Sequence, residues 1–108
     1  MINVSAEQLE TIKRILAEYA GDCEVRAFGS RVNGLAKRYS DLDVALVAPN
    51  KIKLRTKMLL REAFEESDLP FRVDIIDYHA ASDEFRAIIN AKYGNRSGLF
   101  RPEVAVMV

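Results

Sequence analysis

Several residue types that support common protein chemistry are scarce in this chain of 108 residues. It contains one cysteine, Cys23, one histidine, His79, and no tryptophan. A single cysteine cannot form an intramolecular disulfide, and one Cys with one His cannot make a zinc cluster. These absences exclude a disulfide scaffold and a structural zinc domain. They fit a reducing cytoplasm, which we expect to be the location of the protein.

Long apolar runs and an excess of charge of one sign are missing too. No stretch approaches the roughly 18 apolar residues of a membrane span, and the start, MINVSAEQLE, lacks the pattern of a signal peptide. Sixteen Lys and Arg residues balance sixteen Asp and Glu residues, so there is no overall basic field of the kind that draws proteins to nucleic acid. We therefore expect neither membrane association nor direct nucleic-acid binding.

The composition is otherwise that of a globular domain, with 49% hydrophobic and 30% charged residues. A mass of 12.2 kDa allows one core of two packed layers but not a catalytic domain with a separate substrate domain. We expect a single domain over residues 1–108, in which the tail, 93–108, shows no clear period. If the protein is an enzyme, another chain must supply part of its substrate site.

Hydrophobic periodicity predicts helices and strands in the order helix, strand, strand, helix, strand, helix. Ser5 and Gln8 form a capping-box pattern before a helix of about 14 residues that Gly21 closes. The other expected elements are strands at 23–28, 41–48 and 71–77, a helix from 51 to about 67, and a last helix capped by Ser82 with Phe85, Ile88 and Ile89 facing the core. This order predicts an α+β sandwich, a small sheet flanked by helices.

Two aspartates open the second predicted strand, in the stretch GSRVNGLAKRYSDLD at residues 29–43. Residues two apart on a strand point the same way at roughly 6.6 Å spacing, so Asp41 and Asp43 should share a face. Two adjacent carboxylates repel each other, and a divalent cation between them removes that cost. Carboxylate oxygens suit hard ions, so the pair predicts a magnesium site.

A third carboxylate is needed if two ions are to support in-line attack at phosphorus, where the ions lie about 3.5 to 4 Å apart. Asp74 is the candidate, because it lies within the apolar strand FRVDIID. A neighbouring strand would place it within about 5 Å laterally of the pair. Asp77 lies at the end of that strand on the opposite face and is the weaker candidate.

The Gly29-Ser30 pair ends the first predicted strand. If the first two strands are antiparallel neighbours, this turn and the aspartates meet at the same edge of the sheet. Glycine lets backbone approach a ligand closely, and exposed N–H groups with the Ser30 hydroxyl can bind phosphate oxygens. Turn and carboxylates together predict a site for a nucleoside triphosphate with magnesium.

These residues resemble a known signature. Gly29-Ser30, ten residues and Asp41-Leu42-Asp43, with Asp74 in a later strand, are similar to the GSx10DxD motif of the DNA polymerase beta-like nucleotidyltransferase superfamily. The short length resembles its minimal nucleotidyltransferase (MNT) branch, and the likeness runs from residue 23 to about 91. It implies a small mixed sheet flanked by helices, and transfer of a nucleotide from a triphosphate with release of pyrophosphate.

The resemblance also implies roles for single residues. Asp41 and Asp43 would bind both of two catalytic Mg²⁺ ions, and Asp74 would bind the ion that activates the attacking hydroxyl. Gly29 and Ser30 would hold the outer phosphates of ATP, with Arg31 as a further nucleotide-binding candidate.

The same branch implies a protein partner. Many members pair with a small HEPN-domain toxin in toxin–antitoxin systems, where the nucleotidyltransferase acts as antitoxin by adding AMP to a tyrosine of the toxin. We therefore expect a HEPN-domain partner in a hetero-oligomer, with the acceptor protein supplying its own half of the site.

Other interpretations remain open at this point. The chain could be a non-catalytic module that blocks a toxin by covering it, or it could transfer a nucleotide to a small molecule such as an aminoglycoside, although that usually needs a further domain. The basic run 51–61 could contact a partner or a nucleic acid, but a solvated helix face is the simpler interpretation. Tyr39 could stack on a base or pack, His79 suits a loop or cap role, and Cys23 suits the core.

Overall fold

A computed structural model describes residues 4–29, 37, 39–48, 51–92 and 99–100. Its elements are α1 (Ala6–Ala20), β1 (Glu24–Phe28), β2 (Leu42–Val47), α3 (Leu54–Glu65), β3 (Val73–Asp77), a short 3₁₀ turn η1 (Tyr78–Ala80), α4 (Asp83–Lys92) and β4 (Leu99–Phe100). This is the predicted order of helices and strands, with one short strand added inside the tail. No helix within the described ranges is long and apolar enough to cross a membrane.

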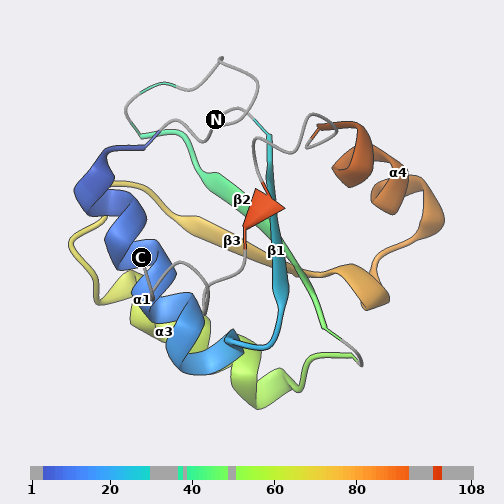
Figure 1. Ribbon diagram of the computed structural model, residues 1–108, viewed down its shortest axis with the longest axis horizontal. Helices are drawn as coiled ribbons and strands as arrows, with labels where there is room; N and C mark the ends of the chain where they lie inside the picture. The colour runs from blue at the N-terminus through green and yellow to red at the C-terminus, as the bar shows by residue number, and fades with distance from the viewer. Residues whose placement is uncertain (1–3, 30–36, 38, 49–50, 93–98, 101–108) are drawn as a thin grey trace.

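The sheet is mixed, with the strand order β3-β2-β1-β4 (Figure 1). Strands β1 and β2 pair antiparallel, as the sequence predicted, and β4 pairs antiparallel with the other side of β1. Strands β2 and β3 run parallel because α3 carries the chain back between them, which returns it to the edge where β2 begins. The predicted α+β class with a small mixed sheet is confirmed.

Most of the core lies on one face of the sheet, under α1 and α3 (Figure 1). Ile12 and Leu16 of α1 and Leu60 of α3 are fully buried against the inward side chains of the strands, such as Val25 and Val44. A smaller cluster on the opposite face joins α4 to the sheet through Ile89, Phe28 and Ala45. Alternate residues of each strand supply the two clusters, as the period of two requires.

Helix α1 begins and ends where the sequence indicated. The Ser5 side chain accepts from the Gln8 backbone N–H at 3.1 Å, and the Gln8 side chain accepts in return from the Ser5 N–H at 2.8 Å, so the capping box is complete. Gly21 is the C-cap, but with φ −63° it stays in the right-handed region rather than the left-handed conformation usual for a capping glycine.

Helix α3 begins later than predicted, at residue 54 instead of 51. The backbone N–H of Ile52 donates to the buried Asp77 carboxylate at 2.9 Å, which holds the segment before the helix against the end of β3. Leu54 and Met58 were part of the pattern that predicted this helix, yet they are 72% and 58% exposed, and Leu60 and Phe64 fill the core instead.

Helix α4 is also only partly as predicted. The Ser82 hydroxyl accepts from the Phe85 N–H at 3.1 Å and caps it as expected. Of the three residues predicted to face the core, Ile89 is fully buried, but Phe85 and Ile88 are 38% and 51% exposed. The prediction was wrong for these two because α4 packs on the sheet through Ile89, while Phe85 lies further out, with its ring perpendicular to that of Phe28 and the centroids 6.0 Å apart.

Candidate active site

The C-terminal end of β1 and the N-terminal ends of β2 and β3 meet at the same end of the sheet. Strand β1 ends there with Phe28 and Gly29, and β2 and β3 begin there, so Phe28 is the register partner of Asp43 and Asp43 is the register partner of Asp74. Two segments about 30 residues apart in the chain thus bring their carboxylates to the same place. The juxtaposition that the sequence predicted for Asp43 and Asp74 is therefore present.

Asp43 and Asp74 lie side by side. Register partners on adjacent strands are about 4.8 Å apart and point their side chains to the same face of the sheet. Asp43 is half-buried between its neighbouring strands, whereas Asp74, on the edge strand, is exposed. The pair therefore combines a half-buried carboxylate, Asp43, with one that faces solvent, Asp74.

The electrostatics of Asp43 are unfavourable in the absence of a cation. Its pKa is raised from 3.8 to about 6, first by burial and then by the negative charges of Asp74 and Asp41. A carboxylate held in such surroundings needs a positive partner or a proton near neutral pH. The donor set, oxygen ligands on a rigid strand, matches what Mg²⁺ prefers.

Gly29 owes its identity to this carboxylate. Its φ is +82°, a conformation that side chains with a Cβ rarely adopt, and a Cβ placed there would lie 2.3 Å from Oδ2 of Asp43. The glycine of the GS motif therefore leaves room for the carboxylate of Asp43. The sequence indicated a close backbone approach to a ligand at Gly29, which stays a prediction; the structure shows a close approach to Asp43.

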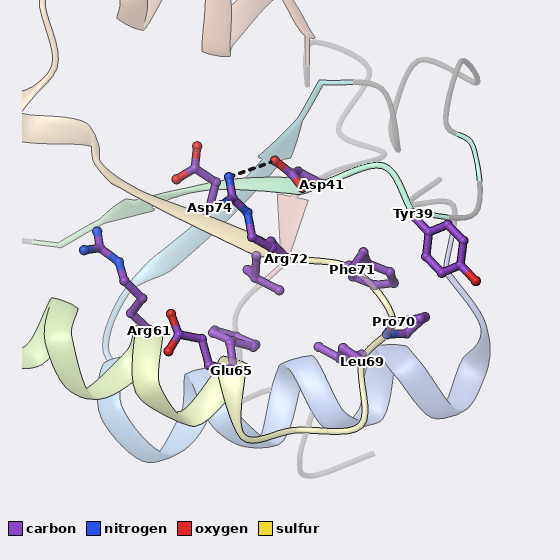
Figure 2. A pocket seen from close by; sticks show the side chains of 11 residues that line it. Tyr39, Asp41, Arg61, Glu65, Leu69, Pro70, Phe71, Arg72 and Asp74 are labelled. Carbon is purple, nitrogen blue, oxygen red and sulfur yellow. Dashed lines mark ion pairs between the residues drawn. The ribbon is translucent and has the colours of Figure 1, made fainter.

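Asp41 is arranged differently from the other two aspartates. Its Oδ2 lies 3.5 Å from Nη2 of Arg72, and both side chains are open to solvent, at 44% and 84% exposure (Figure 2). Within the described residues no three His, Cys, Asp or Glu side chains stand close enough together to hold a metal ion. The residues present thus fit a carboxylate pair, Asp43 and Asp74, with Asp41 turned toward an arginine.

A pocket of about 680 Å³ opens beside the carboxylates, between α3 and the start of β3. Figure 2 shows Arg61 and Glu65 extending from α3 on one side of the pocket, and Arg72 and Asp74 on the strand side, with Asp41 beyond Arg72. The remaining lining residues are Tyr39, Phe64, Leu69, Pro70, Phe71 and Val73. The pocket therefore has an apolar side and a charged mouth that includes two of the three aspartates.

Some predicted site residues fall outside this geometry. Ser30 and Arg31 lie outside the described residues, so their proposed contact with phosphates stays a prediction. Lys37 and Ser40 form a turn, in which the Lys37 N–H donates to the Ser40 hydroxyl at 2.9 Å. This turn leads the chain directly into Asp41.

Asp77, His79 and Cys23 have structural surroundings. Asp77 is 4% exposed and accepts from the N–H groups of Ile52 and His79, and Nε2 of His79 contacts the carbonyl of Ala48 just beyond β2. Burial is the first cause that raises the Cys23 pKa to about 11, so its thiol stays protonated near neutral pH. For His79 and Cys23 these positions agree with the loop or cap role and the core role that the sequence favoured, whereas Asp77, the weaker candidate for the third carboxylate, serves the fold.

Arg72, Arg61 and Glu65 were missed as site residues from the sequence. Arg72 precedes Asp74 by two residues and therefore shares its face of the strand, which was a usable signal. Arg61 and Glu65 come from a helix with many charged residues, and nothing in the sequence separates the two that line the pocket from the others.

Comparisons with known proteins identify the family of the chain. The sequence profile of a nucleotidyltransferase domain matches residues 9–101. A curated relative from Haemophilus influenzae (strain ATCC 51907 / DSM 11121 / KW20 / Rd), described as "Probable protein adenylyltransferase MntA", is 45% identical over 92 residues, which are 85% of this chain and 81% of the relative.

A solved structure shares the fold. It is described as "Crystal structure of the toxin-antitoxin with AMP-PNP", and it superposes with a TM-score of 0.66 at 24% identity, over 76% of this chain and 66% of the other. At that identity the likeness concerns the fold, and the fold agrees with the sheet and helices described above. From the matched profile and the 45% identical relative, the chain belongs to the nucleotidyltransferase domain family, as an enzyme of its minimal, MntA-like branch.

Proposed function

We propose that the protein is a Mg²⁺-dependent protein adenylyltransferase, which transfers AMP from ATP to a tyrosine of a HEPN-domain toxin and thereby acts as its antitoxin. The observation that carries the proposal is the register pair Asp43 and Asp74, with Asp41 two residues away and Gly29 fitted against Asp43. The name of the Haemophilus relative supports protein adenylylation, and the solved structure supports a toxin–antitoxin setting with an ATP analogue.

The proposed reaction is a displacement at the α-phosphorus of ATP. The bond from the tyrosine oxygen to this phosphorus forms while the bond to the β-phosphate oxygen breaks, so pyrophosphate leaves and AMP stays on the tyrosine. The hydroxyl proton leaves toward solvent on the open side of the site, where Asp74 lies. Bound magnesium would supply the positive charge that offsets the phosphate oxygens.

Each residue has a part in this proposal. Asp41 and Asp43 would hold both ions and Asp74 would hold the ion next to the attacking hydroxyl, while Gly29, Ser30 and Arg31 would bind the phosphates. Asp41 is paired with Arg72 through Oδ2, so this ion pair competes with a cation for the carboxylate. An exposed pair of this kind costs little to break, about 0 to 1 kcal/mol.

The test uses ATP labelled at the α-phosphate, Mg²⁺ and a purified HEPN-domain protein as the acceptor. We expect label on a tyrosine of the partner, and loss of that label when Mg²⁺ is chelated or when Asp43 is replaced in Asp43→Asn. Asp22→Asn is the matched control, because it removes an exposed carboxylate at the opposite end of β1. Transfer by Asp43→Asn at the rate of the control would refute the mechanism.

A second candidate function is favoured by the Asp41–Arg72 ion pair and by the lack of a three-ligand cluster within the described residues. The protein would then neutralise a toxin by binding alone. The triple variant Asp41→Asn, Asp43→Asn and Asp74→Asn separates the two functions. Full protection of cells by this variant would favour binding, and loss of protection with an intact complex would favour catalysis.

A further inference from the structure

Helix α3 carries two large apolar side chains that the fold does not use. Leu54 and Met58 are 72% and 58% exposed, although the same helix buries Leu60 and Phe64. Leu54, Met58, Arg61 and Glu65 are spaced i, i+4, i+7 and i+11, so they form one row along the helix, which we call the α3 stripe. The α3 stripe thus begins with two exposed apolar residues and ends with two charged ones.

The charged end of the α3 stripe lies at the candidate active site. Arg61 and Glu65 line the pocket of about 680 Å³ together with Asp41, Arg72 and Asp74 (Figure 2). Leu54 precedes Arg61 by seven residues, which is about 10 Å along a helix. A single helix or extended segment of a partner could therefore contact Leu54 and Met58 and still reach the carboxylates.

The strand beside this helix has an open edge. Strand β3 is the last strand of the sheet on this side, and within the described residues it pairs with β2 alone. The Ile52–Asp77 hydrogen bond holds the start of α3 at the end of β3, while the pocket joins the end of α3 to the start of β3. Helix and strand thus run in opposite directions, so the α3 stripe leads from the end of β3 to its start, where Arg72 and Asp74 lie.

The charge around the apolar end of the α3 stripe indicates what kind of molecule binds there. Residues 51–61 contain five cationic side chains and no acidic one, namely Lys51, Lys53, Arg55, Lys57 and Arg61, and acidic residues begin only beyond this range, at Glu62 and Glu65. Nucleic acid is held by basic surfaces with aromatic side chains on which bases stack, but here the exposed residues between the charges are aliphatic. Aliphatic anchors ringed by cations instead suit a protein surface with apolar residues flanked by acidic ones.

We propose that the α3 stripe is the docking surface for the protein acceptor, and that an apolar, acid-flanked segment of the acceptor packs on Leu54 and Met58. This contact brings the acceptor hydroxyl into the pocket beside Asp41 and Asp74. The inference rests on the proposed function for the identity of the acceptor. It adds the place where the acceptor binds and the chemistry by which it is selected.

The test compares the double variant Leu54→Ser, Met58→Ser with Ile88→Ser, a matched control that removes an exposed apolar residue from α4. The probe is a purified HEPN-domain protein, the acceptor class of the proposed function. Its Kd is measured without ATP by calorimetry, and its KM and kcat are measured in the AMP-transfer assay. We expect the double variant to raise Kd and KM at least tenfold with kcat unchanged, and the control to leave all three as in the wild type.

A charge variant gives an independent readout. Arg61→Glu keeps both apolar anchors and reverses one charge of the α3 stripe, so Kd should rise severalfold and most strongly at low salt. Thermal melting of each variant checks that it is folded, which we expect because all four substituted positions are exposed.

The outcomes separate the two proposals. If the wild-type protein binds the partner but transfers no label to it, adenylylation is refuted. The Kd values of the double variant and of the control still test the α3 stripe in that case. Equal Kd values for the double variant and the control overturn the docking proposal, as does the lack of any complex with the wild type. Binding of single-stranded RNA that the double variant loses, with the Kd of the partner unchanged, overturns it in favour of nucleic acid.

Discussion

Asp74 and Asp77 lie three residues apart on the same short strand, and their surroundings differ in every respect. Asp77 is 4% exposed and accepts two backbone hydrogen bonds, from Ile52 and His79. Asp74 is exposed, accepts no hydrogen bond from the described residues, and has another carboxylate, Asp43, as its register partner. The hydrogen-bonded carboxylate of Asp77 stabilises the fold. The carboxylate of Asp74, placed beside a like charge, is suited to binding a cation.

The largest predicted effect follows from exchanging each of these aspartates for alanine. Asp77→Ala leaves two N–H groups without their acceptor and should cost about 2 to 4 kcal/mol of unfolding free energy in urea denaturation. Asp74→Ala should change stability by less than about 0.5 kcal/mol. It should reduce AMP transfer by roughly three orders of magnitude, about 4 kcal/mol of barrier. Equal stability losses in both variants would contradict the distinction.

Gly29→Ala should have the next largest effect, because the added Cβ lies 2.3 Å from Oδ2 of Asp43 at a φ of +82°. We expect a loss of about 1 to 2 kcal/mol of unfolding free energy from the strained conformation. Transfer activity should also fall, because the Asp43 carboxylate is displaced. Gly21→Ala is the control, since its φ of −63° accommodates a side chain. Wild-type stability of Gly29→Ala would contradict a close contact between residue 29 and the Asp43 carboxylate.

Asp43→Asn should increase stability while it abolishes transfer. The folded-state pKa of about 6 lies above the ordinary 3.8, so ionised Asp43 destabilises the folded chain as pH rises from about 4 to 6. At pH 7 we expect the variant to be more stable by on the order of 1 kcal/mol, after allowance for solvent screening.

The pH dependence of this difference is the check on its cause. Below 3.8 the carboxyl is protonated in both folded and unfolded chains, so the variant and the wild type should unfold alike there in Mg²⁺-free urea titrations. A stability gain of the same size at pH 3 and pH 7 would assign the effect to packing instead of charge.

Arg72→Ala should have the smallest effect. Removing the guanidinium frees Asp41 and takes one positive charge from the neighbourhood of the carboxylates, so the Mg²⁺ affinity should rise about two- to fivefold. A magnesium titration followed by calorimetry measures this. Weaker magnesium binding in the variant would show that Arg72 orients Asp41 for the ion.

The strands and their contribution to the site could be predicted from the sequence because local pattern determines them. Alternating residues in CEVRAF and the apolar run after Asp41 specify strands, and carboxylates inside such strands need an explanation beyond packing. The sequence predicted that a neighbouring strand would bring Asp74 close to the Asp41 and Asp43 pair, and the parallel register of β2 and β3 places it opposite Asp43.

The exposed faces of the helices could not be predicted in the same way. Helix α3 has apolar residues on two sides, and periodicity alone does not tell which side meets the sheet; the packing of α1 and β3 decides for Leu60 and Phe64. Phe85 and Ile88 were misassigned for the same reason. The Asp41–Arg72 ion pair and strand β4 depend on contacts between distant segments, which a local pattern does not specify.

The parallel pairing of β2 with β3 has a consequence for how the protein folds. Asp43 and Asp74 can meet only after the chain has passed through all of α3 and closed a loop of about 30 residues. The entropy of loop closure makes such contacts slow to form, so the β1–β2 hairpin is expected to precede them. The repulsion between the two carboxylates is thus absent from the early folding steps, and it arises only when the last long-range pairing assembles the site.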